Sequence, residues 1–91
     1  MTIEELGNIL VQRREKLGKS IDDAARETKI RVDYLKALED GQVDQLPDRV
    51  FARGFVRQYL HYLRAEDLWP QYNVLLPLNE ETMMMAAQPL G

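Results

Sequence analysis

The fold of this chain is decided by residues 20–41, whose sequence is SIDDAARETKIRVDYLKALEDG. Ser20 and Asp23 are a helix-start signature, because a serine at this position accepts a hydrogen bond from a free backbone amide of the first helical turn. Small and apolar residues then follow at the spacing with which a helix-turn-helix packs its two helices together, namely Ile21, Ala24, Ala25, Ile30, Leu35 and Leu38. The segment therefore predicts one short helix over about 21–28 and a second that ends at Gly41.

The turn between these two helices departs from the usual pattern at Lys29. Glycine is common at this position because it has no side chain to oppose a left-handed backbone. A turn of three to four residues can still form with lysine, and we expect this turn to be somewhat strained.

A helix is also predicted before the motif, over about 3–17. Apolar residues recur there at three- and seven-residue steps, at Ile3, Leu6, Leu10 and Leu17. Thr2 and Glu5 form a capping box for the first turn, and Gly18 supplies the left-handed residue with which many helices end.

Two further helices are predicted after the motif. A polar loop over 41–48 leads to Asp48, which can cap a helix over about 49–63. Pro70 disfavours a regular helix over 66–75, but the apolar spacing there still predicts a short fifth helix.

The length and composition fit a single small domain. The chain has 91 residues, of which 45% are hydrophobic, and such a chain can enclose only one modest core. The predicted fold class is all-α, a compact bundle of five short helices over residues 1–76 that contains the helix-turn-helix. Residues 77–91 show no sustained period and are expected to form a flexible linker or tail.

The composition argues against several classes of function. The chain has no cysteine, and His61 is its single histidine, so we expect neither a disulfide nor a metal site. No nucleophile elbow, phosphate loop or pair of acids in an apolar setting is recognisable, and we expect neither an enzyme nor a cofactor. No apolar stretch is long enough to cross a bilayer, which predicts a soluble, cytoplasmic chain.

Charge is distributed unevenly along the chain. The net charge is -3, which is the wrong sign for a domain that binds phosphates. Residues 20–48 hold four basic and eight acidic residues, a net charge of -4, whereas residues 49–64 hold four arginines and no acid, a net charge of +4. The excess positive charge thus lies in one helix, and most of the functional interpretation depends on this asymmetry.

DNA binding through the second helix of the motif is disfavoured. The outward face of this helix is expected to carry Arg31, Asp33, Lys36, Ala37 and Asp40, so two acids offset two bases. Arg31 and Lys36 are the only candidates there for reading bases. An ordinary solvated face is expected for the acids Asp22, Asp23, Asp33, Glu39 and Asp40.

The helix over 49–63 has more apolar surface than one core-facing stripe requires. One stripe is expected to face inward and comprises Ala52, Val56, Leu60 and Leu63. A second forms an aromatic line at four-, four- and three-residue steps and comprises Phe51, Phe55, Tyr59 and Tyr62. Beside this line, Arg49, Arg53 and Arg57 follow one another at four-residue steps. Like charges at this spacing repel one another in a helix, so helix stability does not explain them. Because aromatic and arginine side chains dominate interface hot spots, this helix predicts a docking surface for an acidic protein partner.

Two observations on this helix leave alternatives open. The aromatic rings can instead be core, packed under the first and fifth helices, with the arginines solvated or paired to Asp44 and Asp48. Gly54, in mid-helix, costs roughly 1 kcal/mol relative to alanine. This glycine suggests close approach by another backbone, either that of the first helix or that of a partner.

Two segments carry a resemblance to a known family. Residues 6–41 read LGNILVQRREKLGKSIDDAARETKIRVDYLKALEDG, and residues 46–63 read LPDRVFARGFVRQYLHYL. Over about residues 5–76 the chain resembles the N-terminal cytoplasmic domain of the RodZ family of bacterial cell-shape proteins, an Xre/lambda-repressor-like helix-turn-helix. The first segment is shared in outline with many Xre-like DNA-binding domains. The second is more specific, because of its aromatic, Arg-Gly and aromatic residues at 51–55.

This resemblance implies a partner and a setting. Members of the family dock on the actin-like filament protein MreB beneath the inner membrane. They do so through aromatic positions of the fourth helix, which fall here on Phe51 and Phe55, with Tyr59 one turn further. Members continue through a basic stretch into a transmembrane helix and a periplasmic domain, so we expect membrane attachment only through a segment beyond this chain.

Three hypotheses follow. The preferred one is an adaptor that binds an MreB-like filament through Phe51, Phe55, Tyr59, Arg49, Arg53 and Arg57. The alternative is an Xre-like transcriptional regulator that binds DNA through Arg31 and Lys36. The third is a self-associating module that uses the same aromatic residues, and the sequence does not predict the oligomeric state.

Overall fold

The structure, a computed structural model, describes residues 1–43 and 49–76, and for residues 49–51 it describes the backbone alone. Its helices are α1 (Ile3–Lys16), α2 (Ile21–Thr28), α3 (Val32–Glu39), α4 (Arg49–Tyr62), the 3-10 helix η2 (Glu66–Leu68) and α5 (Trp69–Leu75). The predicted all-α class is confirmed. The tail predicted over 77–91 and most of the loop predicted over 41–48 lie outside the described residues. Within the described residues, none of the helices has the length and apolar character needed to cross a membrane.

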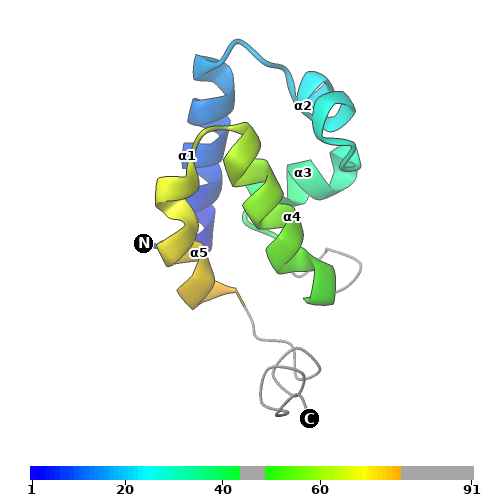
Figure 1. Ribbon diagram of the computed structural model, residues 1–91. Coiled ribbons are helices and arrows are strands. Elements are labelled where there is room, and N and C mark those ends of the chain that lie inside the picture. Colours follow the sequence, from blue (N-terminus) through cyan, green and yellow to red (C-terminus); the bar gives the residue numbers. More distant parts are fainter. Residues whose placement is uncertain (44–48, 77–91) are drawn as a thin grey trace.

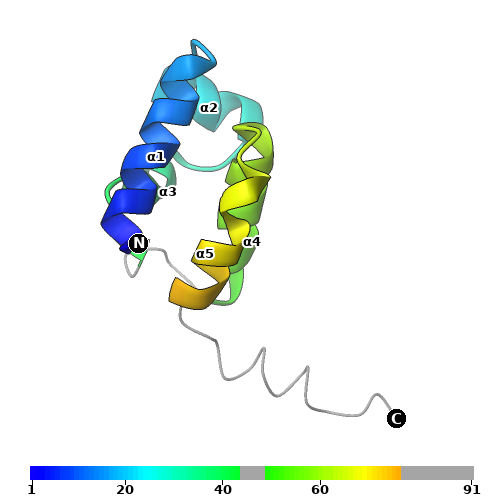
Figure 2. The ribbon, with the colours of Figure 1, turned by 90° about the vertical axis from the view of Figure 1, so that its left-hand side faces the viewer.

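The helices pack around one core, with α1 and α4 as the two long members (Figure 1). α3 packs against α1 and α2, α2 also contacts α4, and η2 and α5 fold back onto α4. Figure 2 shows α1 on one side and α4 with α5 on the other, with α2 and α3 behind them. The largest fully buried side chains come from several helices and include Leu6, Leu35, Tyr59 and Tyr72.

The helix starts follow the capping signals of the sequence. Thr2 accepts a hydrogen bond from the backbone amide of Glu5 at 3.1 Å at the start of α1, which is one half of the capping box predicted there; the reciprocal bond to the Glu5 side chain is absent among the described residues. Ser20 and Asp23 form a capping box at the start of α2, in which each side chain accepts a hydrogen bond from the other residue's backbone amide. Hydrogen bonds to its carboxylate lower the pKa of Asp23 to about 2; the bond from the backbone amide of Ser20 has the largest effect, and the bond from the guanidinium of Arg26 the next largest.

The turn after α2 has the strained backbone that the sequence predicts. Lys29 has φ 62° and ψ 22°, and its amide donates to the carbonyl of Ala25 at 2.9 Å. For a residue other than glycine this left-handed conformation costs about 1 kcal/mol. Thr28 supports the turn, because its hydroxyl donates to the carbonyl oxygen of Ala24 at 2.7 Å and accepts from the amide of Ile30 at 3.2 Å.

α1 and α3 approach each other more closely at Gly7 than any side chain would allow. A β-carbon built on Gly7 would lie 2.3 Å from the backbone oxygen of Glu39, far inside a normal contact distance. The packing of α1 on α3 therefore requires glycine at this position. The apolar periodicity of the first helix does not reveal this requirement.

A buried ion pair joins α1 to α3 near the same contact. The Nε atom of Arg14 donates to Oε2 of Glu39 at 2.8 Å, and the two side chains are 14% and 6% exposed. This hydrogen bond raises the pKa of Arg14. The prediction that Glu39 belongs to a solvated acidic face is wrong, because Arg14 neutralises it within the domain.

The exposed side of α3 is narrower than the sequence predicts. Ala37 is 6% exposed, so the prediction that it faces outward is wrong. The reason is that this helix of eight residues packs against both α1 and α2, so its buried side includes Ala37 as well as Leu35 and Leu38. Arg31, Asp33, Lys36 and Asp40 remain exposed, as predicted.

Candidate functional site on helix α4

The buried side of α4 forms as its spacing predicts. Ala52, Val56 and Leu60 recur every four residues and are at most 6% exposed. Leu63, which is 2% exposed, continues this side after the helix ends. All four side chains belong to the core of the domain, so the opposite side of α4 is available to solvent.

We define the open face of α4 as the exposed residues Gly54, Arg57, Gln58 and His61. They lie three and four positions apart, so they share one side of the helix. A β-carbon built on Gly54 would have no heavy atom of the described residues within 4 Å. Of the two neighbours that this glycine suggests, the first helix is therefore ruled out.

One edge of the open face is aromatic. Phe55 is half-buried, and its ring centre lies 5.6 Å from that of Tyr34 in α3, with the two planes tilted by 34°. The guanidinium carbon of Arg31 lies 5.4 Å from the centre of the Tyr34 ring. Tyr34 thus connects the aromatic surface of α4 to the helix-turn-helix. In the sequence Tyr34 is recognisable only as part of the apolar pattern of its helix, and no signal places it beside Phe55.

The other edge of the open face is basic. The guanidinium carbons of Arg53 and Arg57 lie 5.4 Å and 5.0 Å from the centre of the Trp69 ring in α5. Arg53 also donates to the side chain of Asn73, and its Nη1 atom is buried without a hydrogen-bond partner among the described residues. Stacking on Trp69 supplies a structural reason for the arginine spacing that the sequence alone lacks.

The aromatic and basic residues do not form neighbouring stripes. Phe55 is two positions from both Arg53 and Arg57, which corresponds to about 200° around a helix. Phe55 therefore packs toward α3, whereas the two arginines pack toward α5. Gly54, Gln58 and His61 lie between these two edges, and Arg57 belongs both to the open face and to its basic edge.

Tyr59 does not belong to an accessible aromatic line. Its side chain is fully buried, and its hydroxyl donates to Oε2 of Glu39 at 2.6 Å. Burial raises the pKa of the Tyr59 hydroxyl, and the hydrogen bond with Glu39 raises it further. The prediction that this ring is exposed for a partner is wrong, because it extends into the core and reaches the buried carboxylate from α3.

Tyr62, the last residue of the predicted aromatic line, packs toward α2. Its ring is half-buried and lies parallel to that of Tyr59, with 6.3 Å between the ring centres. Its hydroxyl donates to Oε1 of Glu27 at 2.9 Å. Burial, followed by this hydrogen bond, raises the pKa of Tyr62 to about 12.

Two predicted contact residues lie at the start of α4. The backbone of the helix begins at Arg49 and includes Phe51, but the side chains of both residues lie outside the described part of the structure. Their participation in binding stays a prediction.

His61 lies at the far end of the open face. Its Nδ1 atom is 3.0 Å from Oε2 of Glu66, the first residue of η2. In residues 1–43 and 49–76, no cluster of three or more His, Asp or Glu side chains is placed to hold a metal ion.

The exposed surface of α3 carries balanced charge. Arg31 lies 3.5 Å from Asp33, and both side chains are exposed. Lys36 shares this surface with Asp40. The acids and bases that the sequence places on this surface are both exposed here, and weak attraction to a phosphate backbone stays a prediction.

Comparison with known proteins identifies the family. The helix-turn-helix domain family matches residues 9–67. The cytoskeleton protein RodZ of Streptococcus pneumoniae (strain ATCC BAA-255 / R6) is 31% identical over 67 residues, which cover 74% of this chain and 24% of that protein. The uncharacterized membrane protein YmfM of Bacillus subtilis (strain 168) is 37% identical over 60 residues, which cover 64% of this chain and 21% of that protein. A protein of Haemophilus influenzae (strain ATCC 51907 / DSM 11121 / KW20 / Rd) is 36% identical over 62 residues, which cover 67% and 20%.

The chain spans less than a quarter of the length of each of these relatives. No solved structure matches the chain significantly. The matched family and the named cytoskeleton protein are not enzyme families. The chain therefore belongs to the helix-turn-helix domain family, and its similarity to RodZ and YmfM supports its assignment as a RodZ-like helix-turn-helix domain.

Proposed function

We propose that this domain is the adaptor of a RodZ-like cell-shape protein and binds an actin-like filament of the MreB type through the open face of α4 and its two edges. The observation that carries the proposal is Gly54, which is exposed in mid-helix with no heavy atom of the described residues within 4 Å of a β-carbon built on it. In the full protein the domain would lie on the cytoplasmic side of the inner membrane, and a segment beyond this chain would attach it there.

Gly54 lowers the stability of the isolated domain. Glycine inside a helix costs about 1 kcal/mol relative to alanine. The described part of the domain gives no reason for this cost, because a β-carbon at Gly54 would meet open space. A partner that packs directly on α4 does give a reason, since the two surfaces can come closer where no side chain separates them.

The two edges supply the chemistry of an interface hot spot. Phe55, supported by Tyr34, offers aromatic surface for a pocket in the partner. Arg53 and Arg57 offer guanidinium groups that Trp69 already orients. Oriented arginines lose less side-chain entropy when they pair with carboxylates, so an acidic and partly apolar filament surface fits this site.

The remaining predicted contacts have different roles in this proposal. Phe51 and Arg49 belong to the first turn of α4 and stay among the proposed contacts. Tyr59 is fully buried, so it supports the open face from within the core and does not touch the partner.

Co-sedimentation with purified MreB-type filaments tests the proposal. The test variants are Phe55→Ala and Arg57→Glu, and we expect each to weaken binding by about tenfold or more. Lys36→Glu is the matched control, because Lys36 is also an exposed cation but lies on α3. Circular dichroism and thermal unfolding establish that all three variants fold.

The proposed surface would be contradicted if Phe55→Ala and Arg57→Glu both fold and still pellet with filaments as the parent domain does. Equal loss of binding in Lys36→Glu would also contradict it, because it would indicate a general effect of charge. Sedimentation of the domain without filaments addresses self-association. If the domain forms a dimer and Phe55→Ala dissociates it, self-association through the aromatic residues of α4 would be favoured instead.

DNA binding is a second candidate, favoured by the helix-turn-helix family itself. Arg31, which directly precedes α3, and Lys36 within it are the exposed bases of this surface, but Asp33 and Asp40 share it. We therefore expect no binding to duplex DNA at micromolar concentrations of the domain in a low-salt mobility-shift assay. Tight binding that falls steeply with salt and is lost in Arg31→Ala and Lys36→Ala would establish this candidate instead.

A further inference from the structure

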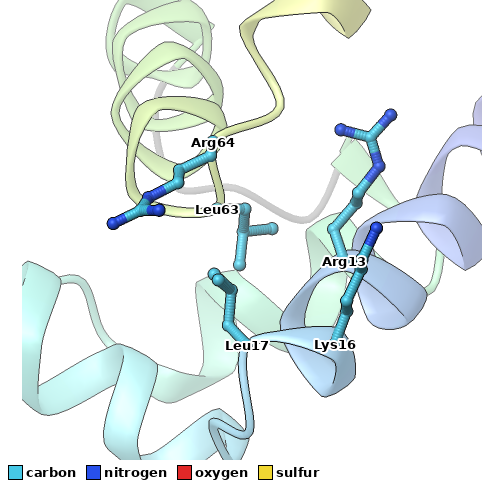
Figure 3. Close-up of a pocket in the computed structure, with 5 residues that line it drawn as sticks. All are labelled: Arg13, Lys16, Leu17, Leu63 and Arg64. Carbon is cyan, nitrogen blue, oxygen red and sulfur yellow. The ribbon is translucent and has the colours of Figure 1, made fainter.

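A pocket lies where the C-terminal ends of α1 and α4 meet. This pocket is lined by Arg13, Lys16, Leu17, Leu63 and Arg64. Figure 3 shows the two leucines facing each other, with Arg64 on one side of them and Arg13 and Lys16 on the other. None of these residues belongs to the open face of α4, so the pocket is separate from the proposed filament surface.

The pocket is cationic in an acidic chain. The chain has a net charge of -3, yet the lining residues include three bases and no acid. Arg13 is already held by Asp67 through hydrogen bonds of 3.1 Å and 2.9 Å. Lys16 and Arg64 are exposed, and neither makes an ion pair with another residue of the described ranges. Two cations are therefore available to a ligand.

Helix dipoles account for only part of this arrangement. The partial negative charge at the end of α1 stabilises a cation such as Lys16. It does not account for Leu17, which is 36% exposed beside these charges. The positive φ of Arg64, 57°, belongs to the end of α4, where the amide of Ala65 donates to the carbonyl oxygen of Leu60 at 2.8 Å.

We propose that this pocket binds an acidic, aliphatic peptide segment of a protein partner. Carboxylates of the segment pair with Lys16 and with Arg64, and a neighbouring branched side chain packs on Leu17, beside the nearly buried Leu63. The charge and the apolar surface of the pocket are both complementary to such a segment. The proposal does not depend on filament binding through α4.

The backbone around the pocket favours a carboxylate over a phosphate. Phosphate sites are commonly built at helix N-termini, where free amides point at the anion. Here two helices end, and their last carbonyls carry partial negative charge. A carboxylate carries a single negative charge at the end of a flexible Asp or Glu side chain, so it can reach the cations without approaching these carbonyls. The exposed part of Leu17 favours an apolar group in the same ligand.

Titration of the isotope-labelled chain followed by NMR tests this site. The probe is the capped peptide LDLDL, and the matched control peptide is LNLNL, which keeps the leucines and lacks the charge. We expect LDLDL to shift the backbone amide signals of residues 16–19 and 63–65. LNLNL should leave the same signals nearly unchanged.

Arg64→Asn is the test variant, because asparagine tolerates the left-handed backbone and removes the charge. Lys29→Asn is the matched control, since Lys29 is the other cation with positive φ in the described chain and does not line the pocket. We expect Arg64→Asn to weaken LDLDL binding by about fivefold, as the loss of one exposed ion pair does. Lys29→Asn should bind as the parent does.

Three results would overturn the proposal. The first is an equal response to LDLDL and LNLNL, which would show that the cations contribute nothing. The second is unchanged binding in folded Arg64→Asn. The third is a stronger response of the same amides to inorganic phosphate or to short-chain phosphatidylglycerol than to LDLDL, which would assign the pocket to a phosphate ligand.

Discussion

The two longest helices, α1 and α4, each carry a glycine in mid-helix, but the surroundings of these glycines are opposite. A β-carbon on Gly7 of α1 would lie 2.3 Å from the backbone oxygen of Glu39 in α3. A β-carbon on Gly54 of α4 would have no heavy atom of the described residues within 4 Å. The domain itself thus requires the first glycine, whereas nothing in its described part requires the second.

The arginines of the two helices differ in the same way. Arg14 of α1 is paired with Glu39 in a nearly buried contact. Arg57 of α4 is exposed, and its guanidinium stacks at the surface on Trp69. α1 therefore uses its glycine and its arginine to close the contact with α3, and α4 keeps the same residue types at its surface. The role of each residue depends on the surface opposite it, which its own helix does not determine.

The largest effect is expected from adding a methyl group where α1 touches α3. Gly7→Ala should lower the free energy of unfolding by about 3 to 4 kcal/mol, because the obstructing atom belongs to the backbone and the helices must move apart. Urea denaturation measures this change, with Gly54→Ala as the matched control in the other helix. A loss below about 1 kcal/mol would show that the α1 to α3 contact adjusts easily, and the contrast between the glycines would fail.

Breaking the buried ion pair is expected to have the next largest effect. Arg14→Met leaves the Glu39 carboxylate buried without its cation, which should cost about 2 to 3 kcal/mol of unfolding free energy. Adding Glu39→Gln removes the stranded charge, so the double variant should be more stable than Arg14→Met alone. Urea denaturation of the three proteins makes the comparison. If the double variant were less stable than Arg14→Met alone, other partners of the Glu39 carboxylate would contribute as much to stability as Arg14 does.

The sequence predicted those features that depend on residues close together in the chain. The capping pairs at Thr2 and Ser20 set the starts of α1 and α2, and Lys29 forms the strained turn. The four-residue spacing of Ala52 and Val56 placed the buried side of α4. Each of these features is determined within one or two helical turns, so one sequence is sufficient to predict it.

The features that the sequence missed depend on contacts between distant segments. Glu39 and Tyr59 are hydrogen-bonded across 20 positions, and only the packing of α3 beside α4 brings them together. A periodic pattern predicts which side of a helix is apolar, but it does not predict which polar group will be neutralised beside it. For this reason Glu39 was expected in solvent and Tyr59 at the docking surface. The pairing of Phe55 with Tyr34 was missed for the same reason.

Gly54→Ala tests the second glycine of the comparison, the one that the described part of the domain does not require. We expect it to raise the free energy of unfolding by about 1 kcal/mol, because alanine favours the helix and meets no obstacle. The same variant should bind MreB-type filaments more weakly, since the methyl group separates the partner from α4. Urea denaturation and filament co-sedimentation measure the two effects on one sample. Greater stability with unchanged binding would remove the argument that a partner requires this glycine.

The smallest effect on stability is expected at Arg57, the exposed counterpart of Arg14. Arg57→Gln should change the free energy of unfolding by no more than about 0.5 to 1 kcal/mol, because it removes one surface stacking contact with Trp69 and no ion pair among the described residues. Under the proposed function, filament binding should nevertheless fall, because a carboxylate of the partner would lose the guanidinium with which it pairs. Thermal unfolding and co-sedimentation separate the two quantities. If Arg57→Gln destabilised the domain as much as Arg14→Met, the arginine would serve the fold, and any loss of filament binding would follow from that damage.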